Sequence, residues 1–309
     1  MMKTNNITNI LVPLDFSEIS LNSLETAIAI AKQQKAKITL LNVVDTSFMF
    51  GFKGVDYVSE KTIDSIVDVS ARMLRPLLTK LKEEHQLECA SEIKVGLVPQ
   101  SIAKTASAID ADLIIMGTHG SSGVREFFMG STAQEVVKIA SCPVLTIPPN
   151  KKWVDFRTIL FPVRPITGGV EKYDFLRKFI GRNNISLKIL ILAPTYDDLE
   201  KKTLRKLVKE LKTKLIEDKI KISGVLKSGR NMPKAVLKMS KSIDADMIVI
   251  TVETDPAFKQ FFIGPFEQHI VNHARVPVLS IRPQSASLDS HVVIQQLHES
   301  FPARMPLMA

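Results

Sequence analysis

The chain has 309 residues, which is enough for two domains of ordinary size that each bury a core. Its composition, 45% hydrophobic and 24% charged, is typical of a soluble globular protein and excludes a disordered chain. No apolar run reaches the roughly 18 to 20 residues of a membrane-spanning helix, and the N-terminus lacks the apolar core of a signal peptide, so we expect a cytoplasmic protein without a membrane partner.

The net charge of +9 is concentrated in one region. Between Lys201 and Arg230 there are eleven Lys and Arg residues and three acidic ones. Leucine and valine recur there at helical spacing, which predicts that the lysines form the solvated face of an amphipathic helix. Nucleic acid is a disfavoured partner because this helix has no aromatic residues on which bases could stack.

Strand and helix patterns alternate along residues 1–150. Apolar runs predict strands at 9–14, 38–44, 111–116 and 143–147, and alternation of apolar and polar residues predicts one at 88–95. Helical spacing predicts helices at 17–32, 61–87, 99–109 and 131–140, with a kink at Pro76. Residues 148–152 are rich in proline and lysine and predict an exposed linker. Five strands alternating with four helices predict a doubly wound α/β fold around a parallel sheet.

A glycine-containing segment follows the fourth strand. It reads Gly117-Thr118-His119-Gly120 and, after nine residues, Gly130-Ser131-Thr132, which opens the next helix. Glycines after a strand let backbone N–H groups approach an anion, and a helix N-terminus supplies further donors and a positive dipole end. The segment therefore predicts a phosphate-binding loop. His119 has no acidic or basic partner at a defined spacing, so we interpret it as a loop residue and not as a general base.

The spacing Gly-x2-Gly-x9-Gly-Ser, together with the upstream strand and the segment 11–17, resembles the ATP-binding branch of the universal stress protein family. The resemblance is close over residues 8–148 and weaker over 157–283. It implies two tandem Rossmann-like domains of the adenine nucleotide alpha hydrolase type, each a five-stranded parallel sheet with strand order 3-2-1-4-5. The expected boundaries are 1–150 for the nucleotide-binding domain, 151–283 for a degenerate second domain, and 284–309 for a C-terminal tail.

In that strand order, the first and fourth strands flank the crevice where ligands bind in open α/β sheets. Asp15 and Gly117 follow and end these two strands, so both are expected at one site. The resemblance implies that this site holds ATP, or ADP or AMP, with Mg²⁺ as the companion ion. The residues implied to bind the nucleotide are Pro13, Leu14, Asp15, Val43, Met116, Gly117, His119, Gly120, Gly130, Ser131 and Thr132. Asp15 would accept hydrogen bonds from the ribose or adenine, with a turn or helix-capping aspartate as the alternative interpretation.

The second half repeats the first. The segments 109–114 and 142–147 reappear at 243–248 and 276–281, with an offset of 134 in both cases, which indicates a tandem duplication. The repeat has lost the site: Thr251 stands where Gly117 does, Pro265 stands for Ser131, and Arg164 takes the place of Asp15. We therefore predict one nucleotide site per chain, in the N-terminal half.

Three further expectations concern assembly and metals. The resemblance implies that the strand at 144–147 pairs with the one at 278–281 within the chain, which would protect two edges. A homodimer of two chains is possible, and the sequence leaves it open. His269 and His273 stand four residues apart on a predicted helix, but the glutamate of a catalytic zinc motif is absent between them, so we predict no metal site there.

Two alternatives to an ATP-binding regulator follow from the same sequence. One is an interaction module without a nucleotide site, as in the non-binding branch of the family. The other is an adenylating enzyme, which is disfavoured because residues 13–17 lack the glycines of its phosphate loop. We predict no catalytic residues, and at most slow ATP hydrolysis, because nothing supplies a convincing base to activate water.

Overall fold

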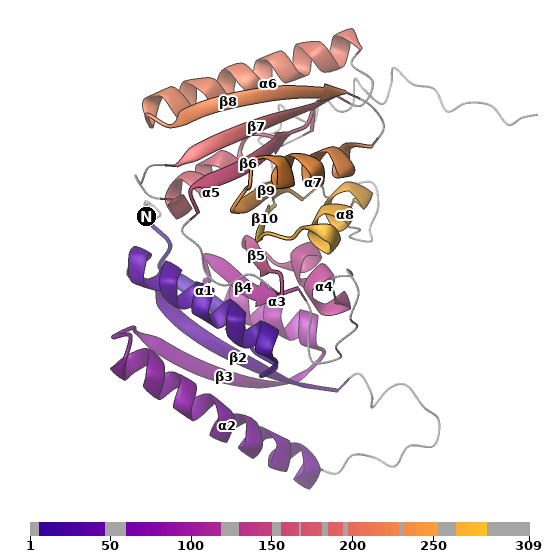
Figure 1. Cartoon of the computed structure of the whole chain (residues 1–309). Helices are drawn as coiled ribbons and strands as arrows, with labels where there is room; N and C mark the ends of the chain where they lie inside the picture. The colour runs from indigo at the N-terminus through magenta and orange to yellow at the C-terminus, as the bar shows by residue number, and fades with distance from the viewer. Residues whose placement is uncertain are drawn as a thin grey trace, which may run out of the picture.

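The structure is a computed structural model, and it describes residues 6–46, 60–118, 130–149, 156–166, 168–180, 185–193, 197–228, 231–252 and 264–282. These residues form one ten-stranded sheet with helices on both faces (Figure 1). Residues 47–59, most of the predicted linker, and the whole predicted C-terminal tail lie outside the described residues.

The first half contains the predicted alternation of strands and helices. Its elements are β1 (Asn9–Pro13), α1 (Glu18–Gln34), β2 (Lys37–Asp45), α2 (Glu60–Glu83), β3 (Cys89–Gly96), α3 (Val98–Ala108), β4 (Leu113–Gly117), α4 (Ser131–Ile139) and β5 (Val144–Ile147). Helix α2 continues through Pro76 but ends four residues before the predicted boundary. The chain turns there, with Gln86 at a φ of 54° and the Leu87 N–H donating to the Leu81 carbonyl.

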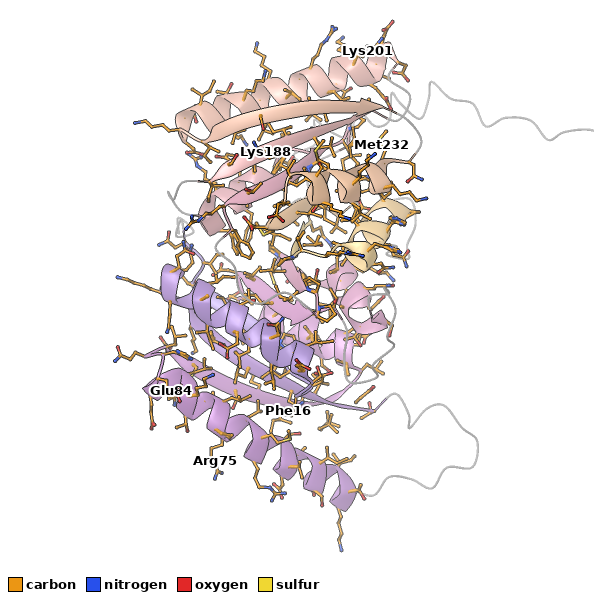
Figure 2. All side chains as sticks on the ribbon, in the orientation of Figure 1. Phe16, Arg75, Glu84, Lys188, Lys201 and Met232 are labelled. Atoms are coloured by element: carbon orange, nitrogen blue, oxygen red, sulfur yellow. The ribbon has the colours of Figure 1, made fainter. Side chains whose placement is uncertain are left out.

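The second half repeats this succession. Its elements are β6 (Thr158–Val163), α5 (Lys172–Ile180), β7 (Ser186–Ala193), α6 (Asp198–Glu217), β8 (Lys221–Ser228), α7 (Met232–Ser242), β9 (Met247–Thr251), α8 (Pro265–His273) and β10 (Val278–Ile281). Helix α6 buries Leu204, Leu211 and Leu215. Its lysines, such as Lys201 in Figure 2, lie on the outer helix of this half, so the predicted amphipathic helix is confirmed.

The strand order is β3-β2-β1-β4-β5-β10-β9-β6-β7-β8. Each half therefore has the predicted order 3-2-1-4-5 with parallel neighbours, and the predicted fold class is confirmed. The halves meet where β5 and β10 pair antiparallel, with Leu145 opposite Leu279. These are the two strands whose pairing the family resemblance implied. The two expected sheets are thus continuous as one, and the edges of β5 and β10 are covered.

Two hydrophobic cores lie on opposite faces of the sheet, because successive strand residues point to opposite faces. Helices α1, α2, α5 and α6 pack on one face, and α3, α4, α7 and α8 pack on the other. Leu145 and Leu279 belong to the first core, whereas Val144 and Val278 belong to the second. Each core therefore runs through both halves, and side chains fill the space between sheet and helices (Figure 2).

The repeated segment at 109–112 and 243–246 has a structural role in both halves. Asp110 and Asp244 both take a left-handed φ of 48°, which turns the chain out of the preceding helix. The Asp112 carboxylate oxygen Oδ2 then accepts hydrogen bonds from the Thr8 N–H at 2.7 Å, the Thr8 hydroxyl at 2.8 Å and the Asn9 N–H at 3.1 Å. Asp246 accepts equivalent bonds from the backbone at the start of β6. Each aspartate therefore fixes the start of the central strand of its half.

Replacing Asp112 by alanine is expected to lower the free energy of unfolding by about 1 to 3 kcal/mol, because three donors lose their acceptor. Chemical denaturation monitored by circular dichroism measures this change. Asp64→Ala, on the exposed face of α2, is the control and is expected to change the free energy by less than about 0.5 kcal/mol. An equal effect of both substitutions would contradict the assigned role of Asp112.

No helix in the described ranges combines the length and hydropathy that a bilayer crossing requires.

Candidate functional site

The candidate site lies at the carboxyl edge of the N-terminal half, where β1 and β4 are neighbours. These strands are parallel, with Ile10 opposite Leu113 and Leu11 opposite Ile114. Their carboxyl ends therefore reach the same edge, which places Asp15, just beyond β1, on the same side of the sheet as Gly117, the last residue of β4. From β1 the chain adds β2 and β3 on one side of the sheet and then crosses back to add β4 and β5 on the other side. Ligands bind at such switch points in open α/β sheets.

Helix α4 begins beside the end of β4. The Gly130 N–H donates to the Thr118 carbonyl at 2.7 Å, and the Thr118 N–H donates to the Ile147 carbonyl at 3.0 Å. Gly130 is the N-cap of α4 and has no side chain with which to cap the first turn. The described structure thus brings Gly117, Gly130, Ser131 and Thr132 together, with Ser131 exposed. His119 and Gly120 lie outside the described residues.

The remaining candidate residues differ in exposure. The side chains of Leu14 and Met116 are 3% and 6% exposed and belong to the two hydrophobic cores. Pro13 and Val43 are half-buried at the ends of β1 and β2. Leu14 and Met116 can therefore offer a ligand only their backbone groups, whereas Asp15 is exposed.

The carboxylate of Asp15 has a local role. Its Oδ1 accepts hydrogen bonds from the Ser17 N–H at 3.0 Å and from the Ser17 hydroxyl at 2.6 Å. Ser17 in turn is the N-cap of α1, and its hydroxyl oxygen accepts from the Ser20 N–H at 3.2 Å. Asp15 therefore supports the cap of α1, which agrees with the alternative interpretation of this residue and does not prevent a second role.

Two residues near the site were not identified from the sequence. Asn42, 7% exposed, donates from its side-chain amide to the Leu14 carbonyl at 2.8 Å. Thr118 is buried and links β5 to α4 through its backbone. The only signal for Asn42 in the sequence is an amide within the otherwise mostly apolar run at 38–44. That signal did not distinguish a positioning role from a satisfied buried amide.

In the C-terminal half, side chains of the protein fill the equivalent crevice. Ile10 of β1 pairs with Leu113, and Ile159 of β6 pairs with Met247 in the same way, so Ile10 and Ile159 are equivalent positions. Asp15 and Arg164 each lie five residues further along the chain and are therefore equivalent too. The Arg164 guanidinium forms an ion pair with Glu267. It also lies over the Phe266 ring, 3.9 Å from the centroid. Glu267 is fully buried in the first turn of α8, so an internal carboxylate occupies this helix N-terminus.

Lys172 completes this closed crevice. Its ammonium group donates to the Pro162 carbonyl at 2.6 Å, the Gly169 carbonyl at 2.9 Å and the Thr251 hydroxyl at 3.3 Å. The Thr251 hydroxyl in turn donates to the Gly168 carbonyl at 3.1 Å. Burial lowers the pKa of Lys172 well below its ordinary value, and Arg164 lowers it further while Glu267 raises it. Lys172 therefore joins the ends of β6 and β9 to the segment before α5.

The described residues contain no group of three or more His, Cys, Asp and Glu side chains that could hold a metal. The rings of His269 and His273 stack 4.3 Å apart, and His273 Nδ1 lies 2.9 Å from the His269 carbonyl oxygen. This pair thus lacks a third ligand within the described part of the chain. Cys89 and Cys142 are free thiols, and burial raises the pKa of Cys142 to about 12.

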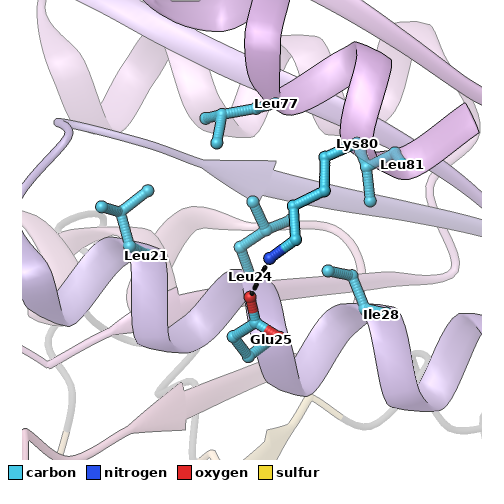
Figure 3. A pocket seen from close by; sticks show the side chains of 7 residues that line it. All are labelled: Leu21, Leu24, Glu25, Ile28, Leu77, Lys80 and Leu81. Atoms are coloured by element: carbon cyan, nitrogen blue, oxygen red, sulfur yellow. Dashed lines mark hydrogen bonds and ion pairs between the residues drawn. The ribbon is translucent and has the colours of Figure 1, made fainter. Parts of the chain in front are cut away.

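A small pocket lies between α1 and α2 (Figure 3). Its volume of about 170 Å³ is below the roughly 300 Å³ at which ligand sites begin. The ion pair between Lys80 and Glu25, 3.1 Å apart, crosses it (Figure 3). We assign no ligand to this pocket. The residues that line it are Leu21, Leu24, Glu25, Ile28, Leu77, Lys80 and Leu81.

The fold and the position of the site define the class: a tandem doubly wound α/β protein with a candidate ligand site at the switch point of its N-terminal half. The model of the universal stress protein family matches residues 6–148 and again 186–282, and the chain belongs to this family. The stretch between the two matches contains Arg164 and Lys172, the residues that help to close the second crevice.

Two curated relatives in this family each match about half of this chain. Universal stress protein MJ0531 of Methanocaldococcus jannaschii is 32% identical over 148 residues, which are 48% of this chain and 86% of the relative. Universal stress protein YxiE of Bacillus subtilis is 30% identical over 145 residues, 44% of this chain and 96% of the relative. A crystal structure of a universal stress protein from Archaeoglobus fulgidus matches at a TM-score of 0.70 with 17% identity, over 91% of this chain and 98% of that one. This likeness shows that both have the same overall fold.

Proposed function

We propose that the protein is an ATP-binding stress-response regulator with one nucleotide site, in the N-terminal half. One observation carries the proposal. The end of β1, the end of β4 and the uncapped first turn of α4 converge at the switch point of the sheet. Unpaired N–H donors and a positive dipole end favour phosphate at a helix N-terminus, and the exposed Ser131 adds a hydroxyl donor.

The remaining residues would hold the nucleoside. Asp15, exposed beyond β1, would accept hydrogen bonds from the ribose hydroxyls, and the Val43 backbone would contact the adenine. Backbone groups of Pro13, Leu14, Met116 and Gly117 would line the crevice, and His119 and Gly120 would complete the phosphate loop. Mg²⁺ would be held mainly by the phosphates, because no acidic cluster is found in the described residues.

The C-terminal half supports a stoichiometry of one. The buried pair of Arg164 and Glu267 takes the place that a nucleotide would need at the carboxyl edge, and Pro265 replaces the donor of Ser131. We therefore propose that residues 151–283 form a partner domain that binds no nucleotide. The antiparallel pairing of β5 with β10 covers the edge that a second chain would need, so we propose that one chain is the functional unit. We further propose that it acts in the cytoplasm and hydrolyses ATP slowly at most.

A second candidate function is an interaction module without a nucleotide site. The bonds from Ser17 to Asp15 favour it, because they give Asp15 a structural role beside the N-cap residue Ser17 that needs no ligand. The two candidates differ in one measurable property, which is binding of ATP by the purified protein.

Isothermal titration of ATP with Mg²⁺ tests the proposal. We expect about one nucleotide per chain, bound at the α4 N-terminus. Gly130→Val is expected to weaken binding at least about tenfold, because a branched side chain at the N-cap obstructs the approach of a phosphate to the α4 N-terminus, at a cost comparable to one charge-assisted hydrogen bond. Gly264→Val is the matched control, because both glycines are helix N-caps with nearly equal dihedral angles, φ −57° and ψ 147° against φ −56° and ψ 148°. It is expected to leave ATP binding unchanged, because the proposed site lies only in the N-terminal half.

Two results would contradict the proposal. If neither the wild type nor Gly264→Val binds ATP, the interaction module becomes the better description. If two nucleotides bind per chain, or if Gly264→Val weakens binding as much as Gly130→Val, the closed crevice of the C-terminal half has been misinterpreted.

A further inference from the structure

The turn that carries Asp15 has a backbone conformation that needs support. Phe16 takes a φ of 62°, in the left-handed region that residues other than glycine seldom adopt. Such a conformation persists only when its surroundings hold it in place, and it is commonly found at binding sites. The side chain of Phe16 packs against the first hydrophobic core. The two hydrogen bonds from Ser17 to the Asp15 carboxylate link the residues on either side of Phe16.

Asn42 contacts the backbone just before this turn. Its amide group donates 2.8 Å to the Leu14 carbonyl, which belongs to the peptide bond that leads into Asp15. The Leu14 N–H donates to the Leu41 carbonyl, also at 2.8 Å, so β2 fixes both backbone polar groups of Leu14. Asn42 is 7% exposed and adjoins Val43, the other residue assigned to the nucleoside.

The C-terminal half lacks both parts of this arrangement. By the same ladder correspondence, Ile191 stands where Asn42 does and Pro165 stands where Phe16 does. The ring of proline holds φ near −65°, so the left-handed turn cannot form there. The fold therefore does not require the turn or the amide. They occur only in the half whose crevice is not filled by Arg164 and Glu267.

We propose that Asn42 is a positioning residue for recognition of the ribose, which rests on the proposed nucleotide-binding function. By holding the Leu14 carbonyl, the amide fixes the peptide from which Asp15 reaches the ribose hydroxyls. Asn42 acts through the Leu14–Asp15 peptide. Its loss lowers selectivity for nucleotides that carry ribose hydroxyls and leaves binding of the phosphates intact.

The test compares the affinities of the full-length protein for ATP and for 2′,3′-dideoxyATP, which lacks both ribose hydroxyls. The wild type is expected to bind ATP about tenfold or more tightly than 2′,3′-dideoxyATP, because the ribose hydroxyls would donate hydrogen bonds to the charged Asp15 carboxylate. Asp15→Ala is expected to lose this preference. Asn42→Leu is expected to reduce the preference at least about threefold, with the affinity for 2′,3′-dideoxyATP changed less than about twofold. In the Asp15→Ala background, Asn42→Leu is expected to have no further effect on the ratio.

Thr39→Val is the matched control, because Thr39 is a buried polar residue, 5% exposed, on the same strand and pairs with Leu11, three residues before Leu14. It is expected to leave the ratio unchanged. Melting temperatures verify that each variant is folded, and Asn42→Ser, which is smaller and still polar, serves if Asn42→Leu does not fold.

The outcomes separate the two proposals. A wild type that binds ATP, together with an Asn42→Leu variant whose ratio is unchanged or whose two affinities fall equally, overturns the positioning role and leaves the proposed function in place. A wild type that binds neither nucleotide overturns the proposed function and this inference with it.

Discussion

Glu267→Ala is expected to lower the free energy of unfolding by about 3 to 5 kcal/mol, because it leaves the guanidinium of Arg164 largely buried without its partner. The Arg164 side chain is 12% exposed and that of Glu267 is fully buried, so water cannot readily replace the lost carboxylate. Lys172 lies in the same closed crevice, where its ammonium nitrogen contacts the Pro162 carbonyl and burial lowers its pKa well below the ordinary value. Denaturant unfolding at neutral pH measures the effect.

Two comparison variants make this prediction specific. Glu210→Ala removes an exposed partner of Lys214, 3.7 Å away, and is expected to cost less than about 1 kcal/mol. The double variant Arg164→Leu with Glu267→Leu is expected to recover most of the lost stability, since hydrophobic pairs of similar volume often replace buried ion pairs without cost. A loss in Glu267→Ala no larger than in Glu210→Ala would mean that the pair does not support this half of the molecule.

Leu279→Ala is expected to destabilise the whole chain by about 2 to 5 kcal/mol, the cost of deleting most of a buried leucine side chain. Leu279 is fully buried in β10 opposite Leu145 of β5, and both belong to a core that runs through the two halves. We therefore expect one unfolding transition, with faster amide hydrogen exchange in β1 as well as in β6. Hydrogen exchange with mass spectrometry, read strand by strand, distinguishes the halves.

Leu199→Ala is the control for this substitution, because Leu199 is 48% exposed on α6. It is expected to change stability by less than about 0.5 kcal/mol. Two separate unfolding transitions, with exchange in β1 unaffected by Leu279→Ala, would instead show that residues 1–150 and 151–283 unfold as independent domains.

Several features of this protein could be predicted from local sequence. Apolar runs located four of the five strands of the first half, because burial on both faces of a parallel sheet demands continuous apolar strands. An alternating pattern located β3, which lies at the edge of the sheet, and helical spacing located the four helices. The offset of 134 between segments such as 109–114 and 243–248 revealed the duplication. The end of α2 was misplaced by four residues, because the turn at Gln86 depends on a backbone bond from Leu87 to Leu81.

The candidate site was only partly predictable. Asp15 and Gly117 carry recognisable signals, a carboxylate and a glycine at the ends of strands, and the family resemblance joined them. Asn42 has no such signal, because its role depends on the Leu14 carbonyl 28 positions away in the chain. The replacement of Asp15 by Arg164 was visible in the sequence, but its partner Glu267 was not, since the two are 103 residues apart.

The sequence by itself determined the order of elements, the tandem organisation and the family, because these follow from periodicity, repetition and short motifs within each segment. Only the tertiary structure decided how the second crevice is closed and how the two cores run across the junction of β5 and β10. Both depend on pairs of residues that are remote in the chain. These contacts form only when the ten strands are aligned in the folded sheet. No local sequence pattern specifies that Arg164 pairs with Glu267 or that β5 pairs with β10.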